Sequence, residues 1–149
     1  MDKFEKENPT NLEKYRTDKA HQEMETRVYS TLDHVRERGK VASKNFLEVW
    51  KKSVKLVDTE FFNIKSDTVD DATDKWQLAP NLKFIQKASE DYSHGTRVLS
   101  ALMYSFYDSE EGHKLLEHFG TPNFVDALGA LDFEGAENIV TLGSNHSDW

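Results

Sequence analysis

The sequence predicts an all-α fold, namely a single-domain helical bundle with two long helices and a C-terminal cluster of short helices. Apolar residues recur at spacings of three and four along most of the 149 residues, which is the period of a helix. No stretch shows the alternating β-branched pattern that is typical of a strand. Three prolines, Pro9, Pro80 and Pro122, separate the helical stretches.

The first long helix is expected over residues 11–38, after a flexible charged tail at 1–10. Thr10 or Asn11 can cap its start, and Gly39 fits the position just past its end, after a basic last turn. Its apolar stripe is thin, which suits an outer helix or a seam between two copies of the chain. The stripe consists of Leu12, Tyr15, Met24, Val28, Leu32 and Val35.

A helix of intermediate length is expected over residues 41–63, where the apolar residues form a broad face. These residues are Phe46, Val49, Trp50, Val54, Val57 and Phe61. The following segment, 63–80, breaks the pattern and is interpreted as a loop. About two turns of helix in this loop would carry Val69, Ala72 and Trp76 and end before Pro80.

The second long helix is expected over residues 81–107, the strongest periodic signal in the chain. One continuous helix would place eight residues on a single face. They are Leu82, Ile85, Ala88, Tyr92, Gly95, Leu99, Leu102 and Phe106. The alternative is a break at Gly95, with Ser93 capping a new helix. A glycine on the inward face is most simply a place where another helix packs closely.

The cluster of three short helices is expected to form an acidic subdomain over residues 108–143. Asp108 or Ser109 can cap the first helix, and Gly120 can end it.

The second short helix is expected to open with Thr121 as the cap and Pro122 at the first helical position. Asp132 can cap the third, which would end at Gly143. Residues 144–149 then form a C-terminal tail, and the single all-α domain spans 11–143.

The composition indicates a cytoplasmic protein. The chain contains no cysteine, so disulfides and thiolate chemistry are excluded, and the mean hydropathy is −0.74. The charged start has no apolar core of the kind found in secretory signals, and no run approaches the roughly 18 apolar residues of a membrane span. We therefore expect no membrane association.

The net charge of −8 is concentrated in the last 42 residues. Residues 108–149 carry nine acids and one base, whereas residues 1–107 carry 18 of each sign. Capping and solubility account for part of this excess. Acidic side chains together with Phe119, Phe124, Phe133 and Trp149 would suit docking of a basic protein surface.

The sequence thus predicts a non-catalytic interaction or regulatory protein with an acidic C-terminal face for a basic protein partner. The predicted partner-binding residues are Glu110, Glu111, Glu117, Phe124, Glu134 and Glu137. We expect no catalytic residues, no cofactor and no bound metal. A homodimer through the thin stripe of the first helix is a further expectation.

The first alternative is a metal-binding protein of the di-metal carboxylate type. Asp91 and His94, like Glu110 and His113, have the i, i+3 spacing that such bundles use. The further carboxylates that a di-metal site needs are not evident, because neither Glu48 nor Glu60 lies clearly inward. A plain joint between helices is therefore the favoured interpretation of residues 93–120.

The second alternative is a nucleic-acid-binding module on the basic helix 36–55. That stretch holds seven bases against two acids: Arg36, Arg38, Lys40, Lys44, Lys51, Lys52 and Lys55. Trp50 could stack on a base. The overall charge of −8 argues against this role, because long-range attraction to phosphates would be weak or repulsive.

Overall fold

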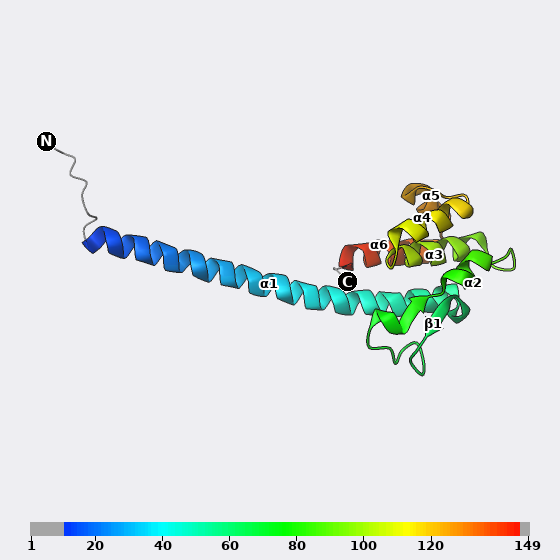
Figure 1. Ribbon diagram of the computed structural model, residues 1–149, viewed down its shortest axis with the longest axis horizontal. Coiled ribbons are helices and arrows are strands. Elements are labelled where there is room, and N and C mark those ends of the chain that lie inside the picture. The colour runs from blue at the N-terminus through cyan, green and yellow to red at the C-terminus, as the bar shows by residue number, and fades with distance from the viewer. Residues whose placement is uncertain (1–10, 147–149) are drawn as a thin grey trace. The chain divides into compact units, whose positions relative to one another are not determined.

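The computed structural model describes residues 11–146, with side chains from residue 16 on. The chain divides into two units, Met1–Val41 and Ala42–Trp149. Within the described residues, six α-helices, one two-stranded sheet and short 3-10 helices make up the regular structure (Figure 1). The predicted fold class is confirmed in that the protein is mostly helical, whereas the bundle arrangement and the number of domains stay predictions. The predicted tail at 1–10 lies outside the described residues.

Helix α1 (Asn11–Val57) continues through Gly39, so the predicted division into two helices at that residue is wrong. A glycine ends a helix when it adopts a positive φ angle. Among the described glycines only Gly120 does so. A glycine inside a helix costs about 0.5–1 kcal/mol relative to alanine, which the helical residues on both sides outweigh.

The C-terminal end of α1 at Val57 comes earlier than the predicted boundary at residue 63. Asp58 interrupts the helix with a φ of 145°, a costly conformation for a residue other than glycine. The Asp58 carboxylate accepts a hydrogen bond from the backbone N–H of Glu60 (3.1 Å) and so caps the 3-10 helix η1 (Thr59–Phe61). This local capping replaces the last predicted turns.

A small antiparallel sheet, absent from the sequence-based expectation, follows in the second unit. Strand β1 (Phe62–Ile64) pairs with β2 (Leu78–Pro80), and Asn63 lies opposite Ala79. Three residues are too few to show the alternation that predicts a strand. Pro80 is the last residue of β2.

The loop between the strands contains less helix than expected. Its helical part is the 3-10 helix η2 (Lys75–Gln77), in place of the two predicted turns. Val69 and Ala72 are nevertheless buried, whereas Trp76 is 53% exposed. The loop is thus anchored by small and medium apolar side chains.

Two helices, α2 (Leu82–Lys87) and α3 (His94–Ser105), replace the predicted continuous helix over 81–107. The break lies before Gly95, which is inside α3. The alternative prediction was correct in its cap, because Ser93 accepts a hydrogen bond from the N–H of Thr96 (3.1 Å).

The three short helices of the C-terminal cluster are confirmed as α4 (Ser109–His118), α5 (Phe124–Gly129) and α6 (Phe133–Asn145). Asp108, one of the two candidates, caps α4, and Asp132 caps α6 as predicted. Both are short polar side chains that can satisfy the free N–H groups of a first turn.

The end of α4 agrees with the prediction, whereas the start of α5 and the end of α6 differ from it. Gly120 follows α4 with a φ of 83°, as expected for a glycine that ends a helix. Asn123, not Thr121, caps α5, so the predicted start of this helix is wrong. Helix α6 continues past Gly143 to Asn145, which shortens the predicted tail, and residues 147–149 lie outside the described part.

Gly95 lies at a close packing contact, as the sequence suggested. A Cβ atom at this position would be 3.1 Å from the carbonyl oxygen of Ala130, the residue that follows α5. Gly112 makes a closer approach that the sequence did not reveal. A Cβ atom there would lie 2.5 Å from Cα of Ser105, so α4 packs backbone to backbone on α3.

Trp50 is the centre of the core in the second unit. Its side chain is fully buried, and its Nε1–H donates to the carbonyl oxygen of Leu78 (3.0 Å). The ring stacks on Phe46 (centroids 5.5 Å apart) and meets the edges of Phe62 and Phe106. These contacts join the end of α1, the sheet and the end of α3.

Tyr107 makes stability depend on pH in the alkaline range. Its hydroxyl donates to the carbonyl oxygen of Lys75, and burial, assisted by the charge of Asp74, raises the pKa of Tyr107. Below pH about 10, its ordinary pKa, the tyrosine is neutral in the folded and unfolded states, so its contribution is fully present. Above that pH the unfolded state alone loses the proton, and stability falls.

We expect Tyr107→Phe to lower the free energy of unfolding at neutral pH by about 1 kcal/mol, through loss of this hydrogen bond. Its stability should then fall less steeply above pH 10 than that of the wild type. Urea denaturation at a series of pH values tests this. If the free energies of unfolding of the two proteins fell equally steeply above pH 10, the role assigned to Tyr107 would be contradicted.

Candidate functional site

The six predicted partner-binding residues lie on α4, α5 and α6 of the second unit. All are solvent-exposed except Glu111, which is partly buried. Among the described residues, no hydrogen bond or ion pair joins the acids of α4 to those of α6. The two groups are therefore treated as separate parts of the acidic surface.

The acids of α4 are partly engaged within their own helix. Glu111 accepts a hydrogen bond from Nζ of Lys114 (3.1 Å), and this carboxylate raises the pKa of Lys114. Lys114 thus pairs with Glu111 at a spacing of three, within the same helix. Glu117 lies 2.8 Å from Nε2 of His113. These pairs give two of the acids of α4 a role within their own helix, so those acids do not require a partner protein.

The acids of α6, by contrast, form no ion pair with any described residue. Glu134 lies in the first turn, where the helix dipole favours an acid, and Glu137 follows one turn later. Both are exposed, and their spacing of three places them on the same side of the helix. Phe133 (83% exposed) and Val140 (53% exposed) lie on the adjoining side.

The aromatic residues of the predicted face divide into exposed and buried ones. Phe124 is 54% exposed, so it is available for contact. Phe119 is only 8% exposed and lies under the guanidinium of Arg97 (5.7 Å from ring centroid), so its predicted exposure is wrong. Trp149 lies outside the described residues.

An apolar groove of about 420 Å³ lies beside Phe124 and Val140. Its lining comes from α3 and the residue after it, α5 and α6: Leu102, Ser105, Phe106, Phe124, Ile139, Val140, Gly143 and Ser144. Because these positions come from three separate stretches of the chain, no local pattern could have predicted the groove.

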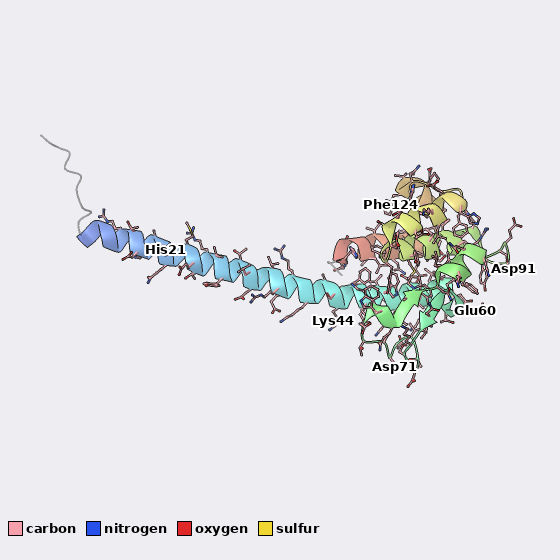
Figure 2. All side chains as sticks on the ribbon, viewed as in Figure 1. His21, Lys44, Glu60, Asp71, Asp91 and Phe124 are labelled. Atoms are coloured by element: carbon pink, nitrogen blue, oxygen red, sulfur yellow. The ribbon has the colours of Figure 1, made fainter. Side chains whose placement is uncertain are left out.

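Figure 2 labels Phe124 at one edge of the second unit and Asp71 at the opposite edge.

The residues of the metal hypothesis are spread over a loop and two helices. Asp91 lies between α2 and α3, where its carboxylate accepts a hydrogen bond from Ser89 (3.1 Å). His94 begins α3, and Glu110 and His113 lie on α4. Within residues 16–146, no three His, Asp or Glu side chains converge where they could hold a metal ion.

Two lysines of the nucleic-acid hypothesis, Lys51 and Lys55, bind Asp70 in the loop between β1 and β2. Lys55 forms an ion pair with Asp70 (2.7 Å), and this base lowers the pKa of the Asp70 carboxyl. Lys51 donates to the carbonyl oxygen of Asp70 (3.0 Å). Lys51 and Lys55 thus have partners within the fold, which reduces the basic surface left for a phosphate backbone.

Comparison with protein families, curated proteins and solved structures found no match. Within the described residues, no helix is both long enough and apolar enough to cross a membrane.

Proposed function

We propose that this protein is a non-catalytic interaction or regulatory protein of the cytoplasm. Its α5–α6 surface, defined by Phe124, Glu134, Glu137 and Val140, binds a protein partner with a basic surface. Glu110, Glu111 and Glu117 on α4 are assigned to the same function by charge alone.

The observation that carries this proposal is the combination of an apolar groove with unpaired acids on one of its helices. Val140 lines the groove, and Glu137 lies three residues before it on the same helix. Exposed apolar side chains supply affinity when a partner covers them, because water is removed from their surface. Nearby charges of one sign speed and orient the encounter with a partner of the opposite sign.

The chemistry of the partner follows from this combination. An apolar side chain of the partner would enter the groove beside Phe124, and flanking lysines or arginines would face Glu134 and Glu137. An arginine is well suited because it forms two hydrogen bonds with a carboxylate. Because the acids are exposed, we expect their contribution to depend strongly on salt.

Capture from a lysate of the native host tests the proposal. The tagged wild-type chain should retain a specific protein at about 50 mM NaCl and lose most of it at about 500 mM, since the charges are then screened. Phe124→Ser should reduce retention roughly tenfold at low salt through loss of apolar contact. Because Phe124 is half exposed, this variant should unfold at nearly the same urea concentration as the wild type.

Equal retention by the wild type and Phe124→Ser would contradict the proposed surface. Retention that is unaffected by salt would contradict the electrostatic part of the proposal.

A further inference from the structure

The first unit carries apolar side chains that nothing within that unit covers. Every described side chain from residue 16 to 38 is exposed. This includes four of the six residues of the predicted stripe, and from here on these four are called the apolar stripe of α1. They are Met24 (64% exposed), Val28 (51%), Leu32 (45%) and Val35 (52%). A helix in water derives most of its stability from packing of such a stripe.

Ion pairs within this part of α1 do not replace packing. His21 pairs with Glu25 (3.0 Å), and Arg36 lies 3.6 Å from Asp33. Both pairs are exposed to solvent, where an ion pair contributes little. The stripe therefore stays exposed to water unless another helix packs on it.

The spacing of the stripe favours an almost straight pair of helices. From Met24 to Val35 the residues are separated by four, four and three positions, which is 11 residues in three turns. That period lies close to the natural period of an α-helix and gives little supercoiling.

We propose that the stripe of α1 pairs with the same stripe of a second copy of this chain, with the two helices antiparallel and crossing near residue 30. In this register Val28 lies opposite Leu32 of the second copy, and Met24 lies opposite Val35. The two-fold axis repeats both contacts, so all eight apolar side chains of the two stripes are covered.

Charge complementarity selects the antiparallel orientation. Four charged residues follow one edge of the stripe: Asp18, Glu25, Arg36 and Lys40. The acids occupy the N-terminal half of this edge and the bases occupy the C-terminal half. In an antiparallel pair this edge meets itself in reverse, so Glu25 faces Arg36 of the second copy and Asp18 faces Lys40. The two-fold axis gives four such attractive pairs.

A parallel pair combines attraction with repulsion. Each edge would then meet the opposite edge of the second copy, which carries Arg16, Arg27, His34 and Arg38. Asp18 would meet Arg16 and Glu25 would meet Arg27, but Arg36 and Lys40 would lie close to Arg38 and repel it, which the antiparallel pair avoids. In the antiparallel pair the opposite edge meets itself and contributes no attraction, so the preference rests on the edge with mixed charges.

This inference is independent of the proposed function, because it uses only residues of the first unit. Its test exploits the absence of cysteine from the chain. Full-length Met24→Cys and Val35→Cys are purified separately, mixed under reducing conditions and then oxidised mildly. We expect a disulfide between the two variants in the mixture. Met24→Cys alone should not cross-link, because its two cysteines would be roughly 17 Å apart along the helix.

Several outcomes would overturn the proposal. Efficient self-linking of Met24→Cys would show a parallel pair. The absence of any cross-link would refute this register, and a monomer mass in sedimentation equilibrium would refute pairing itself. As a background control, Glu23→Cys points away from the stripe and should not cross-link.

Charge exchange gives a second test with a matched control. Glu25→Arg should weaken dimerisation roughly tenfold, because two attractive pairs become repulsive. Adding Arg36→Glu to this variant should restore the wild-type affinity, since the exchanged charges face each other again. Glu23→Arg makes the same change in charge on the outer side and should have little effect. Failure of the double variant to recover would overturn the proposed facing of Glu25 and Arg36.

Discussion

Trp50→Ala is expected to lower the free energy of unfolding of the second unit by about 3–5 kcal/mol. The substitution removes the largest fully buried side chain and its stacking on Phe46. It also leaves the buried carbonyl oxygen of Leu78 without the hydrogen bond from Trp50, which adds to the loss. Urea denaturation followed by circular dichroism measures the change.

Trp50→Phe separates the two causes. It keeps an aromatic ring but removes the indole N–H, so we expect an intermediate loss of about 1–3 kcal/mol. A change below about 1 kcal/mol in Trp50→Ala would contradict the central position of this residue, because a fully buried tryptophan cannot be truncated at so small a cost.

Gly112→Ala is expected to lower the free energy of unfolding by about 3 kcal/mol. This loss of stability is second only to the one expected for Trp50→Ala. The added methyl group would lie 2.5 Å from Cα and 2.9 Å from the backbone nitrogen of Ser105. Backbone atoms cannot move aside as the end of a flexible side chain can. Helices α3 and α4 must therefore separate, which disturbs the packing of α4, whose buried side chains include Leu115 and Leu116.

Gly143→Ala is the matched control for this prediction. Gly143 also lies inside a helix, α6, but a Cβ atom there would meet no atom within 4 Å. Alanine should therefore raise the stability by about 0.5–1 kcal/mol through its higher helix propensity. Similar urea midpoints for Gly112→Ala and Gly143→Ala would contradict the close contact between α3 and α4.

Local signals predicted the parts of the fold that depend on neighbouring residues. The sequence predicts Asp132 as a cap, offers Asp108 as one of two candidates and offers Ser93 only in the alternative with a broken helix, because a short polar side chain before an apolar pattern has a local role. Gly39 was misinterpreted because a helix-ending glycine and an interior glycine look alike until the φ angle is known. The sheet was missed because the pairing of Asn63 with Ala79 joins residues that are distant in sequence.

The candidate site was less predictable than the fold. Phe119 and Phe124 occur in the same acidic stretch, yet one is buried under Arg97 and the other is exposed. Their exposure depends on how α3, α4 and α5 pack, which no local spacing reveals. The groove beside Val140 likewise requires the tertiary arrangement, whereas the concentration of acids after residue 108 was evident from composition.

The most direct test of the central claim is the affinity of charge-reversed variants for the protein captured at low salt. Glu134→Lys with Glu137→Lys reverses the unpaired acids of α6. Asp67→Lys with Asp71→Lys makes the same change in net charge in the loop between the strands. Asp71 lies at the opposite edge of the unit from Phe124 (Figure 2).

We predict that the α6 double variant binds the purified partner at least roughly tenfold more weakly than the wild type at about 50 mM NaCl. The loop variant should bind with nearly wild-type affinity, because its changed charges are distant from the groove. An equal loss in both variants would mean that only net charge matters, and unchanged binding by the α6 variant would mean that α6 is not the binding surface. Either result would contradict the proposed function.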